Sequence, residues 1–278
     1  MHASRLKSST MKGTSMTSVN GLRCVVTGAA SGIGHAVAEQ LIKGGAEVTS
    51  LDRNTPTAAV NEHIAIDLAD PASIDKAVEQ LGTGWNALIN VAGIPGTAPS
   101  ELVFKVNFLG LRHLTESFFD RLEPGSAIVN VASTAGFQWA ARLEAHRALL
   151  AADDFESGLE WFRRHPQEGN TYNFSKEAVI VYTMAMAAGL VEQEMRMNAV
   201  LPGPVETPIL ADFEESMGKD TLDGVKFLLG RHATPDDIAS AVLFLASAES
   251  GWVNGHPLVV DGGITGAVLS GLVPPPEL

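Results

Sequence analysis

Two residues that can move a proton, Tyr172 and Lys176, lie four positions apart in the sequence. At that spacing two side chains share one face of a helix. A free tyrosine has a pKa of about 10, and a nearby ammonium group favours the phenolate and lowers that pKa. The pair could therefore protonate a carbonyl oxygen or deprotonate an alcohol. The pattern Tyr-x-x-x-Lys is common, so an exposed pair on a helix is the alternative.

Two further polar residues suit the same chemistry. Ser133 follows the apolar run Ala127–Val131, and Asn107 lies within a long predicted helix. Residues near the carboxyl ends of parallel strands meet in one crevice, where both could approach Tyr172. Ser133 would then hydrogen-bond the substrate oxygen. A buried asparagine inside a helix needs partners, so we expect Asn107 to hold a water linked to Lys176.

A glycine-rich turn, Thr27–Gly34, joins the first predicted strand to the first predicted helix. A dinucleotide pyrophosphate needs a tight turn, a backbone free of side chains and available N–H groups at a helix N-terminus. The spacing G-x-x-x-G-x-G differs from the commoner G-x-G-x-x-G, so a purely structural turn is the alternative. The turn residues that we predict to contact the cofactor are Gly28, Ser31, Gly32, Ile33 and Gly34.

Asp52 follows the second predicted strand, Glu47–Leu51. At this place a carboxylate accepts hydrogen bonds from the adenosine ribose hydroxyls, and its charge repels a 2′-phosphate. Asp52 therefore favours NAD over NADP. The neighbouring Arg53, which we also predict to contact the cofactor, could meet a phosphate and so weakens this preference. An exposed carboxylate at a strand end, with no ligand, is the alternative.

Short apolar runs alternate with helical patterns from Gly21 onward, and these runs are apolar on both faces. The alternation predicts an α/β fold, with a single Rossmann-like domain in which helices cover both faces of a doubly wound parallel sheet of about seven strands. We assign residues 21–264 to this domain, 1–20 to a leader and 265–278 to a C-terminal tail. The expected strands are 22–27, 47–51, 63–66, 87–91, 127–131, 197–202 and 257–260. The expected helices are 33–43, 72–81, 100–122, 173–193 and 235–247.

One segment, about 138–169, interrupts this alternation before Tyr172. Its apolar side chains recur at helical spacing in two groups, which are Trp139, Leu143, His146 and Leu150, and then Phe155, Leu159 and Phe162. A connection of this length usually carries its own helices and often serves as a lid or an interface. A passive surface addition is the alternative.

The composition disfavours several kinds of partner. A net charge of −13 argues against nucleic acid and against an anionic membrane. The single cysteine, Cys24, cannot form an internal disulfide, so we expect a reducing, cytoplasmic location. The histidines lack metal-ligand spacing, and no apolar stretch is long enough to span a membrane, so we expect neither a metal nor a membrane anchor. Residues 1–20 are rich in Ser and Thr without any acid, which suits a disordered leader, a tag, an upstream start or a transit peptide.

In this order and on these elements, the motifs resemble those of the short-chain dehydrogenase/reductase family over roughly residues 21–263, and Asp261–Gly263 belongs to the same pattern. The resemblance implies a catalytic tetrad of Asn107, Ser133, Tyr172 and Lys176. It also implies that Tyr172 and Lys176 touch the cofactor, with Lys176 on the nicotinamide ribose. The remaining cofactor contacts that it implies are Asp67 and Leu68 near adenine, Asn90, Ala92 and Gly93 along the crevice, and Pro202, Val205 and Thr207 near the nicotinamide amide.

The long segment between Ser133 and Tyr172 departs from the pattern of most family members. It resembles a subgroup that contains bacterial 3α-hydroxysteroid dehydrogenase/carbonyl reductase and coniferyl alcohol dehydrogenase, in which an insertion at this point changes the subunit contact. The resemblance therefore implies a homo-oligomer, as a homodimer in preference to a homotetramer.

Together these features predict an NAD-dependent oxidoreductase that interconverts a hydrophobic alcohol, such as a hydroxysteroid or an aryl or allylic alcohol, and its carbonyl compound. Residues 94–97, 137–140, Pro204 and 209–229 would shape the substrate pocket, and the apolar side chains of Leu222 and Phe227 suit such a substrate. An NADPH-dependent 3-oxoacyl thioester reductase is the alternative enzyme, which Asp52 and the insertion disfavour. A non-catalytic NAD-binding protein is the alternative from another class.

Overall fold

The computed structural model describes residues 18–217 and 219–273. Within these residues one sheet of seven strands forms, in the order β3-β2-β1-β4-β5-β6-β7, and each neighbouring pair is parallel. The strands are β1 (Arg23–Thr27), β2 (Glu47–Asp52), β3 (Glu62–Ala65), β4 (Trp85–Asn90), β5 (Leu122–Val131), β6 (Arg196–Pro202) and β7 (Pro257–Val260). The predicted doubly wound parallel sheet is confirmed.

The strand order changes direction in the middle of the sheet. β1 pairs with β2 on one side and with β4 on the other, so that Thr27 lies opposite both Leu51 and Asn90. From β1 the chain winds outward to β3, and from β4 it winds the other way to β7. A crevice therefore opens beyond the carboxyl ends of β1 and β4, which is where ligands bind in sheets of this kind.

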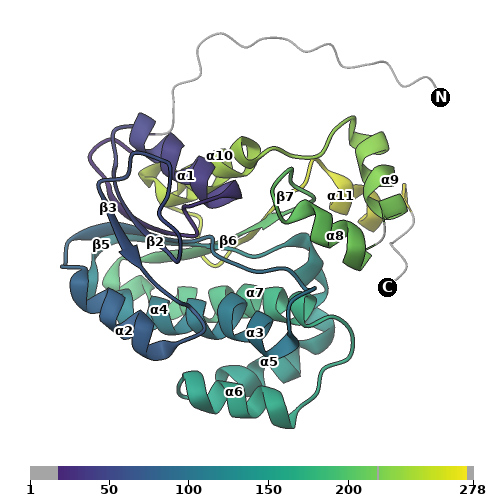
Figure 1. Cartoon of the computed structure of the whole chain (residues 1–278), viewed down its shortest axis with the longest axis horizontal. Coiled ribbons are helices and arrows are strands. Elements are labelled where there is room, and N and C mark those ends of the chain that lie inside the picture. The colour runs from purple at the N-terminus through teal and green to yellow at the C-terminus, as the bar shows by residue number, and fades with distance from the viewer. Residues whose placement is uncertain (1–17, 218, 274–278) are drawn as a thin grey trace.

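Helices cover both faces of the sheet (Figure 1). The layer on one face consists of α1 (Gly32–Lys43) and α10 (Pro235–Ala246). The layer on the other face consists of α2 (Pro71–Gln80), α4 (Leu111–Phe118) and α7 (Thr171–Gly189). Each layer packs against the sheet and forms an apolar core with it. Successive residues of a strand point into opposite cores, as Val25 and Val26 of β1 do. This is why the strands are apolar on both faces.

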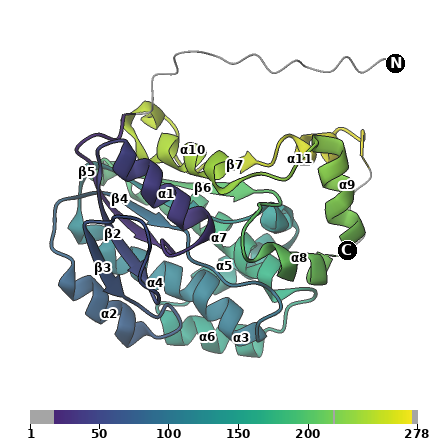
Figure 2. The same ribbon diagram turned by 45° about the horizontal axis from the view of Figure 1, so that its top comes forward.

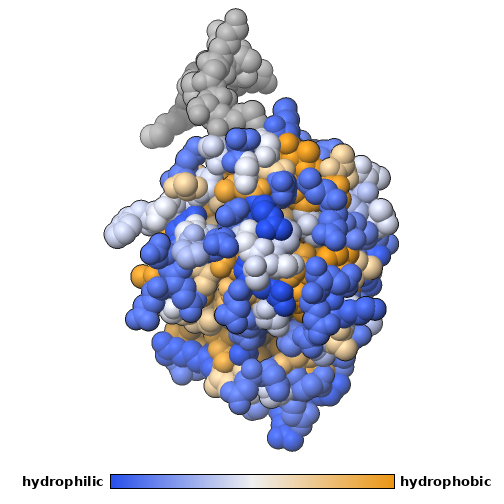
Figure 3. Space-filling model, turned by 90° about the vertical axis from the view of Figure 1, so that its left-hand side faces the viewer, coloured by the Kyte–Doolittle hydropathy of each residue, from blue (hydrophilic) through white to orange (hydrophobic). Residues whose placement is uncertain are grey.

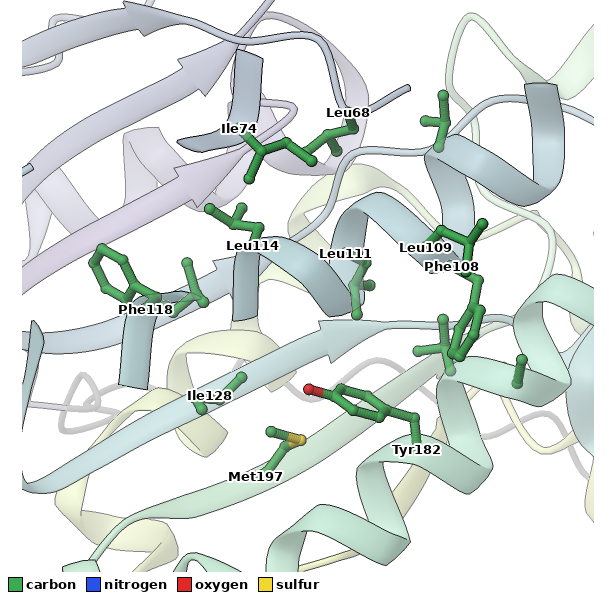
Figure 4. Close-up of a cluster of buried hydrophobic side chains, with 14 of the residues drawn as sticks. Leu68, Ile74, Phe108, Leu109, Leu111, Leu114, Phe118, Ile128, Tyr182 and Met197 are labelled. Carbon is green, nitrogen blue, oxygen red and sulfur yellow. The ribbon is translucent and has the colours of Figure 1, made fainter. Parts of the chain in front are cut away.

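The core beneath α4 and α7 is the one that supports the helix with Tyr172 and Lys176. Figure 4 shows Leu114 and Phe118 of α4 on one side of this core, with Ile128 of β5 and Tyr182 of α7 on the other. Tyr182 and Phe118 are each at most 1% exposed. Side chains packed to this degree fix the position of α7 relative to the sheet.

The predicted helix 100–122 is a continuous helical run that changes type along its length. α3 (Ser100–Phe104) passes into a π-helical segment, η1 (Lys105–Gly110), before α4 begins, and a short 3-10 segment, η2 (Phe119–Arg121), ends the run. β5 then begins at Leu122, earlier than the predicted Ala127. A π segment inserts an extra residue into a turn and is frequent at functional sites. The apolar pattern continues across η1, so the sequence does not reveal it.

The insertion before Tyr172 folds into three helical segments, which are η3 (Thr134–Arg142), α5 (Leu143–Leu150) and α6 (Phe155–Arg164). α6 lies on the outer side of α3 and α7, away from the sheet (Figure 1). Phe155 and Leu159 of α6 are buried as their spacing predicts. Trp139, however, belongs to η3 and not to the helix that carries His146. The effect of the insertion on the subunit contact stays a prediction.

Two features of the described residues differ from the predicted domain boundaries. Val19, which falls in the predicted leader, is 1% exposed and belongs to the core around α1. A further helix, α11 (Ile264–Leu269), occupies part of the predicted tail. A single apolar residue or one short helix carries too little periodicity to mark such a limit. The other leader residues, 1–17, lie outside the described part of the chain.

α8 (Leu210–Met217) and α9 (Lys219–Leu229) follow β6 and stand with α11 at one end of the molecule (Figures 1 and 2). Among the described residues, none of the helices combines the length and the apolar character that crossing a membrane requires. Figure 3 shows one face of the molecule, on which hydrophilic residues predominate and hydrophobic ones form small separate patches.

Candidate active site

A cavity of about 260 Å³ occupies the crevice beyond β1 and β4. The predicted cofactor residues that line it are Gly28, Ser31, Gly32, Ile33, Gly34, Asp52, Arg53, Asp67, Leu68, Ala92, Gly93, Tyr172, Lys176, Pro202, Val205 and Thr207. Ser133 lines the cavity as well, whereas Asn90 and Asn107 do not. The fold thus brings residues from distant parts of the chain to one cavity.

Two positions of the glycine turn cannot carry a side chain, because a Cβ atom there would meet the protein backbone. Gly28 has a φ of +72°, and a Cβ atom there would lie 2.8 Å from the backbone of Ala92. A Cβ atom on Gly34 would collide with the carbonyl oxygen of Gly28. α1 begins directly after Ser31, whose side chain makes no capping hydrogen bond. The first N–H groups of α1 therefore remain available to an anion.

Asp52 is held in a fixed orientation at the edge of the cavity. One carboxylate oxygen accepts the N–H of Ala30 at 3.0 Å, which ties the end of β2 to the glycine turn. The other oxygen accepts the N–H of Asn54 at 2.9 Å. Arg53 is exposed and lines the same cavity. Both charges that bear on a ribose or a 2′-phosphate are thus present where the sequence predicts them.

Tyr172 and Lys176 occupy successive turns at the start of α7. Asn170 caps this helix by accepting the N–H of Tyr172 at 2.8 Å. The Lys176 ammonium nitrogen lies 5.6 Å from the centre of the Tyr172 ring and donates to the carbonyl oxygen of Val131 at 2.9 Å. The side chain of Ser133 hydrogen-bonds the Tyr172 hydroxyl. The predicted residues Ser133, Tyr172 and Lys176 therefore lie together at the cavity wall.

Burial controls the protonation of this pair. It raises the pKa of Tyr172 to about 12, although the hydrogen bond with Ser133 lowers it. Burial also lowers the pKa of Lys176 to about 8. Loss of water destabilises the phenolate, and the Ser133 hydrogen bond acts in the opposite direction, while the predicted lowering of the Tyr172 pKa by Lys176 stays a prediction.

Asn107 contacts the segment after β4 and does not reach the cavity itself. It lies in η1 and is completely buried. Its side-chain oxygen accepts the N–H of Ile94 at 2.8 Å, and its amide donates to the carbonyl oxygen of the same residue at 3.0 Å. A Cβ atom on Gly93 would lie 3.3 Å from the Asn107 oxygen and 3.5 Å from the Lys176 nitrogen. Asn107 therefore shapes the cavity wall from behind, and its link to Lys176 through a water stays a prediction.

Asn90 does not line the cavity, so its predicted cofactor contact needs correction. Its amide donates to Thr115 at 3.0 Å and to Asn130 at 2.9 Å, and Asn130 in turn donates to Thr183 at 2.9 Å. These residues form a buried polar ladder that joins α4, β4, β5 and α7. Asn90 is the last residue of β4, where a side chain can face either the crevice or the helix layer, and its position in the chain does not decide between them.

Ile94, Pro208 and Ile209 are among the apolar residues that line the cavity, and they suit an apolar substrate. Thr97 donates to a carboxylate oxygen of Asp212 at 2.8 Å, which connects the segment after β4 to α8. The predicted contribution of residues 137–140 is wrong for the two aromatic side chains, Phe137 and Trp139, because they pack against the core beneath α7.

Leu222 and Phe227 on α9 also differ from the predicted pocket residues. Leu222 is 1% exposed and Phe227 is 92% exposed, and neither lines the cavity. Lining residues that were not predicted are Leu51, Asn54, Ile66, Val91, Val106, Val131, Ala132, Gly203 and Pro208. Most of them adjoin predicted residues at strand ends, and that adjacency is the signal that could have found them.

Comparison with known proteins decides the family. A short chain dehydrogenase family model matches residues 23–148, and an enoyl-(acyl carrier protein) reductase family model matches residues 162–265. The chain is 40% identical over 244 residues to a coniferyl-alcohol dehydrogenase from a Pseudomonas species, with 87% of this chain and 96% of that protein covered. The chain belongs to the short-chain dehydrogenase family. The predicted family is thereby confirmed.

A solved structure and a second sequence relative agree with this assignment. The short-chain dehydrogenase is similar to a 3α-hydroxysteroid dehydrogenase from a Pseudomonas species in complex with NADH, with 31% identity and a TM-score of 0.76 over 89% of this chain and 98% of that one. It is also 31% identical to a 2,3-dihydro-2,3-dihydroxybenzoate dehydrogenase from Bacillus subtilis, over 89% of this chain and 97% of that protein.

The residues of this short-chain dehydrogenase fit the nicotinamide cofactor that its family binds. Glycine at positions 28 and 34 permits the close backbone packing that forms this wall of the cavity, and the start of α1 offers N–H groups to a pyrophosphate. In the described part of the chain, no group of three or more His, Cys, Asp or Glu side chains could hold a metal ion.

Proposed function

We propose that this short-chain dehydrogenase interconverts a hydrophobic alcohol and its carbonyl compound with NAD as the cofactor. One observation carries the proposal. The hydrogen-bonded Ser133–Tyr172 pair and Lys176 line the same cavity as the glycine turn and Asp52. A proton acceptor for an alcohol is thus next to a site that suits a dinucleotide.

Each of the three residues has a distinct role in this proposal. The bound nicotinamide supplies the exchange of hydride, which no side chain of the protein can perform. Tyr172 takes the proton of the alcohol during oxidation and gives a proton to the carbonyl oxygen during reduction. Ser133 donates a hydrogen bond to the same oxygen and keeps it beside Tyr172. Lys176 holds the ribose and carries its positive charge below a pH of about 8.

The preference for NAD rests on Asp52. Its carboxylate is fixed by the N–H groups of Ala30 and Asn54, so it cannot easily turn away from the cavity. A 2′-phosphate beside this carboxylate would be repelled, whereas the two hydroxyls of an unmodified ribose would be bound. The preference for a hydrophobic alcohol is supported by Ile94, Pro208 and Ile209, and by relatives named for coniferyl alcohol and for a 3α-hydroxysteroid.

A turnover assay with NAD and NADP tests the proposal, using steroid, cinnamyl-type and short aliphatic alcohols. Tyr172→Phe keeps the ring and removes only the hydroxyl, so we expect it to lower turnover by roughly a thousandfold. We expect NAD to exceed NADP and the hydrophobic alcohols to exceed the short ones. Full activity of Tyr172→Phe would refute the mechanism, and equal turnover of short alcohols would refute the substrate class. NADH binding without any turnover would favour the non-catalytic alternative.

A further inference from the structure

A buried ion pair connects the insertion to the catalytic helix. Glu177 of α7 is 2% exposed, and Arg142 at the end of η3 donates to its two carboxylate oxygens at 2.8 and 2.6 Å. His146 of α5 lies 2.9 Å from one of the same oxygens and is itself completely buried. Burial raises the pKa of Glu177, but the hydrogen bonds from His146 and Arg142 outweigh it, so the pKa lies below its ordinary value.

Each partner of this ion pair belongs to an element that also carries, or directly follows, a proposed catalytic residue. η3 starts immediately after Ser133, whose hydroxyl oxygen accepts the N–H of Ala135 at 3.1 Å, and it ends at Arg142. On α7, Glu177 follows Lys176 in the sequence. The pair therefore fastens the segment that carries Ser133 to the helix that carries Tyr172.

A second contact between the same two elements is made by backbone. Gly136 of η3 lies so close to α7 that a Cβ atom there would be 2.7 Å from the carbonyl carbon of Lys176 and 2.8 Å from the nitrogen of Glu177. η3 thus rests on α7 at Gly136 and is fastened to it at Arg142. Two points of contact fix the direction of a short helix, whereas one would leave it free to pivot.

Stability alone gives little reason for this arrangement. A buried ion pair loses much of its attraction to desolvation, and well-packed apolar residues in its place are often no less stable. What a bidentate Arg–carboxylate pair supplies is a defined geometry. Here that geometry joins the segment that begins after Ser133 to the helix that carries Tyr172.

We propose that Arg142 and Glu177 are positioning residues, and that their ion pair sets the Ser133 hydroxyl against the Tyr172 hydroxyl. The inference rests on the proposed catalytic roles of Ser133 and Tyr172. On this proposal the insertion acts within the subunit, where it aligns the hydroxyl groups of Ser133 and Tyr172.

The proposal has a consequence for the pH dependence of the reaction. Before the alcohol binds, the hydrogen bond from Ser133 lowers the pKa of Tyr172, so a looser ion pair weakens that bond and raises the pKa. Alcohol oxidation needs the phenolate, and its rising limb then moves to higher pH. The titratable or charged groups that face Glu177 are Arg142 from η3 and His146 from α5, and Lys176 adjoins it on α7.

The double variant Arg142→Met/Glu177→Gln tests this, since it removes both charges together and leaves no buried carboxylate unpaired. We expect kcat for alcohol oxidation at neutral pH to fall by roughly tenfold, and the rising limb to move up by about one pH unit, which corresponds to one hydrogen bond. The Kd for NADH should stay within about twofold, because the ion pair does not line the cavity.

Arg163→Met is the matched control. Arg163 of α6 makes a bidentate pair of the same geometry with Glu101 of α3, at 2.9 and 2.8 Å, which is exposed to solvent and fastens the insertion to α3 and not to α7. We expect its kcat and pH profile to equal those of the wild type. An equal loss in both variants would overturn the proposal, because any attachment of the insertion would then be sufficient.

An unchanged kcat and pH profile in the double variant would also overturn the proposal. If the double variant does not fold, the pH profile of Arg142→Lys tests the proposal instead, because lysine keeps the charge and loses the bidentate geometry. A shift of the pH profile in the same direction supports the inference, and a wild-type profile with a lowered Tm refutes it. Failure of the proposed function is distinguishable, since the wild type itself would then show no turnover that depends on Tyr172.

Discussion

Burial acts in opposite directions on the two titratable residues of the site. Water stabilises the charged form of each, so its loss raises the pKa of Tyr172 to about 12 and lowers that of Lys176 to about 8. Between these values both side chains are neutral. Enclosure by the protein therefore favours the neutral form of both side chains.

Lys176 should make cofactor binding sensitive to pH. Its positive charge is present below a pH of about 8 and is lost above it, so we expect the Kd for NADH to rise by roughly tenfold across that range. Quenching of protein fluorescence by NADH measures this. Lys176→Met should bind more weakly at neutral pH and show no change around pH 8. The same pH dependence in Lys176→Met would assign the titration to another group.

Asp52 should control the choice between NAD and NADP. Removal of its charge in Asp52→Asn ends the repulsion of a 2′-phosphate, so we expect the ratio of kcat/KM for NADP to that for NAD to rise roughly tenfold. Glu47→Gln is the control, since Glu47 is an exposed carboxylate at the other end of β2. If the ratio changed equally in both variants, net charge and not position would explain it.

At the scale of elements, the predictable features are those whose residues are close together in the sequence. The glycine turn and the Tyr172–Lys176 pair are of this kind, because their spacing alone determines which side chains share a face. The polar ladder through Asn90 and the Arg142–Glu177 pair depend on how separate elements face each other. No local pattern contains that information, and the direction of a strand-end side chain or the presence of a π segment is equally hidden.

The polar ladder should contribute strongly to stability. Asn130→Leu leaves the buried amide of Asn90 with one partner fewer and Thr183 without the donor that Asn130 supplies. We expect the free energy of unfolding in urea to fall by about 2 kcal/mol or more. Asn86→Leu is the control, because half-buried Asn86 accepts a single hydrogen bond, from the N–H of Arg23 at 2.9 Å. A smaller loss for Asn130→Leu than for Asn86→Leu would contradict this view of the ladder.

At the scale of the whole molecule, the cavity joins both halves of the sheet. Gly28 and Asp52 come from the half that winds towards β3, and Ser133 and Thr207 come from the half that winds towards β7. A ligand in the cavity contacts both halves at once, so that unfolding either half must release it.

NADH should therefore stabilise the complete fold. At about 100 times its Kd we expect it to raise the free energy of unfolding by about 2.7 kcal/mol, with one cooperative transition. Thermal denaturation followed by circular dichroism measures the shift. NADPH at the same concentration should give a smaller one, because it meets Asp52. An equal or larger shift with NADPH would contradict the proposed cofactor preference.

The position of β1 in the middle of the sheet has a consequence for synthesis on the ribosome. β1 is made first, yet its neighbour β4 comes much later and the edge strand β7 comes last. During translation, the apolar faces of β4 and β5 emerge before α7 and α10 exist to cover them. Exposed apolar strands of an incomplete domain attract chaperones and promote aggregation. The interval between the synthesis of β5 and that of α10 is thus when the nascent chain most needs protection.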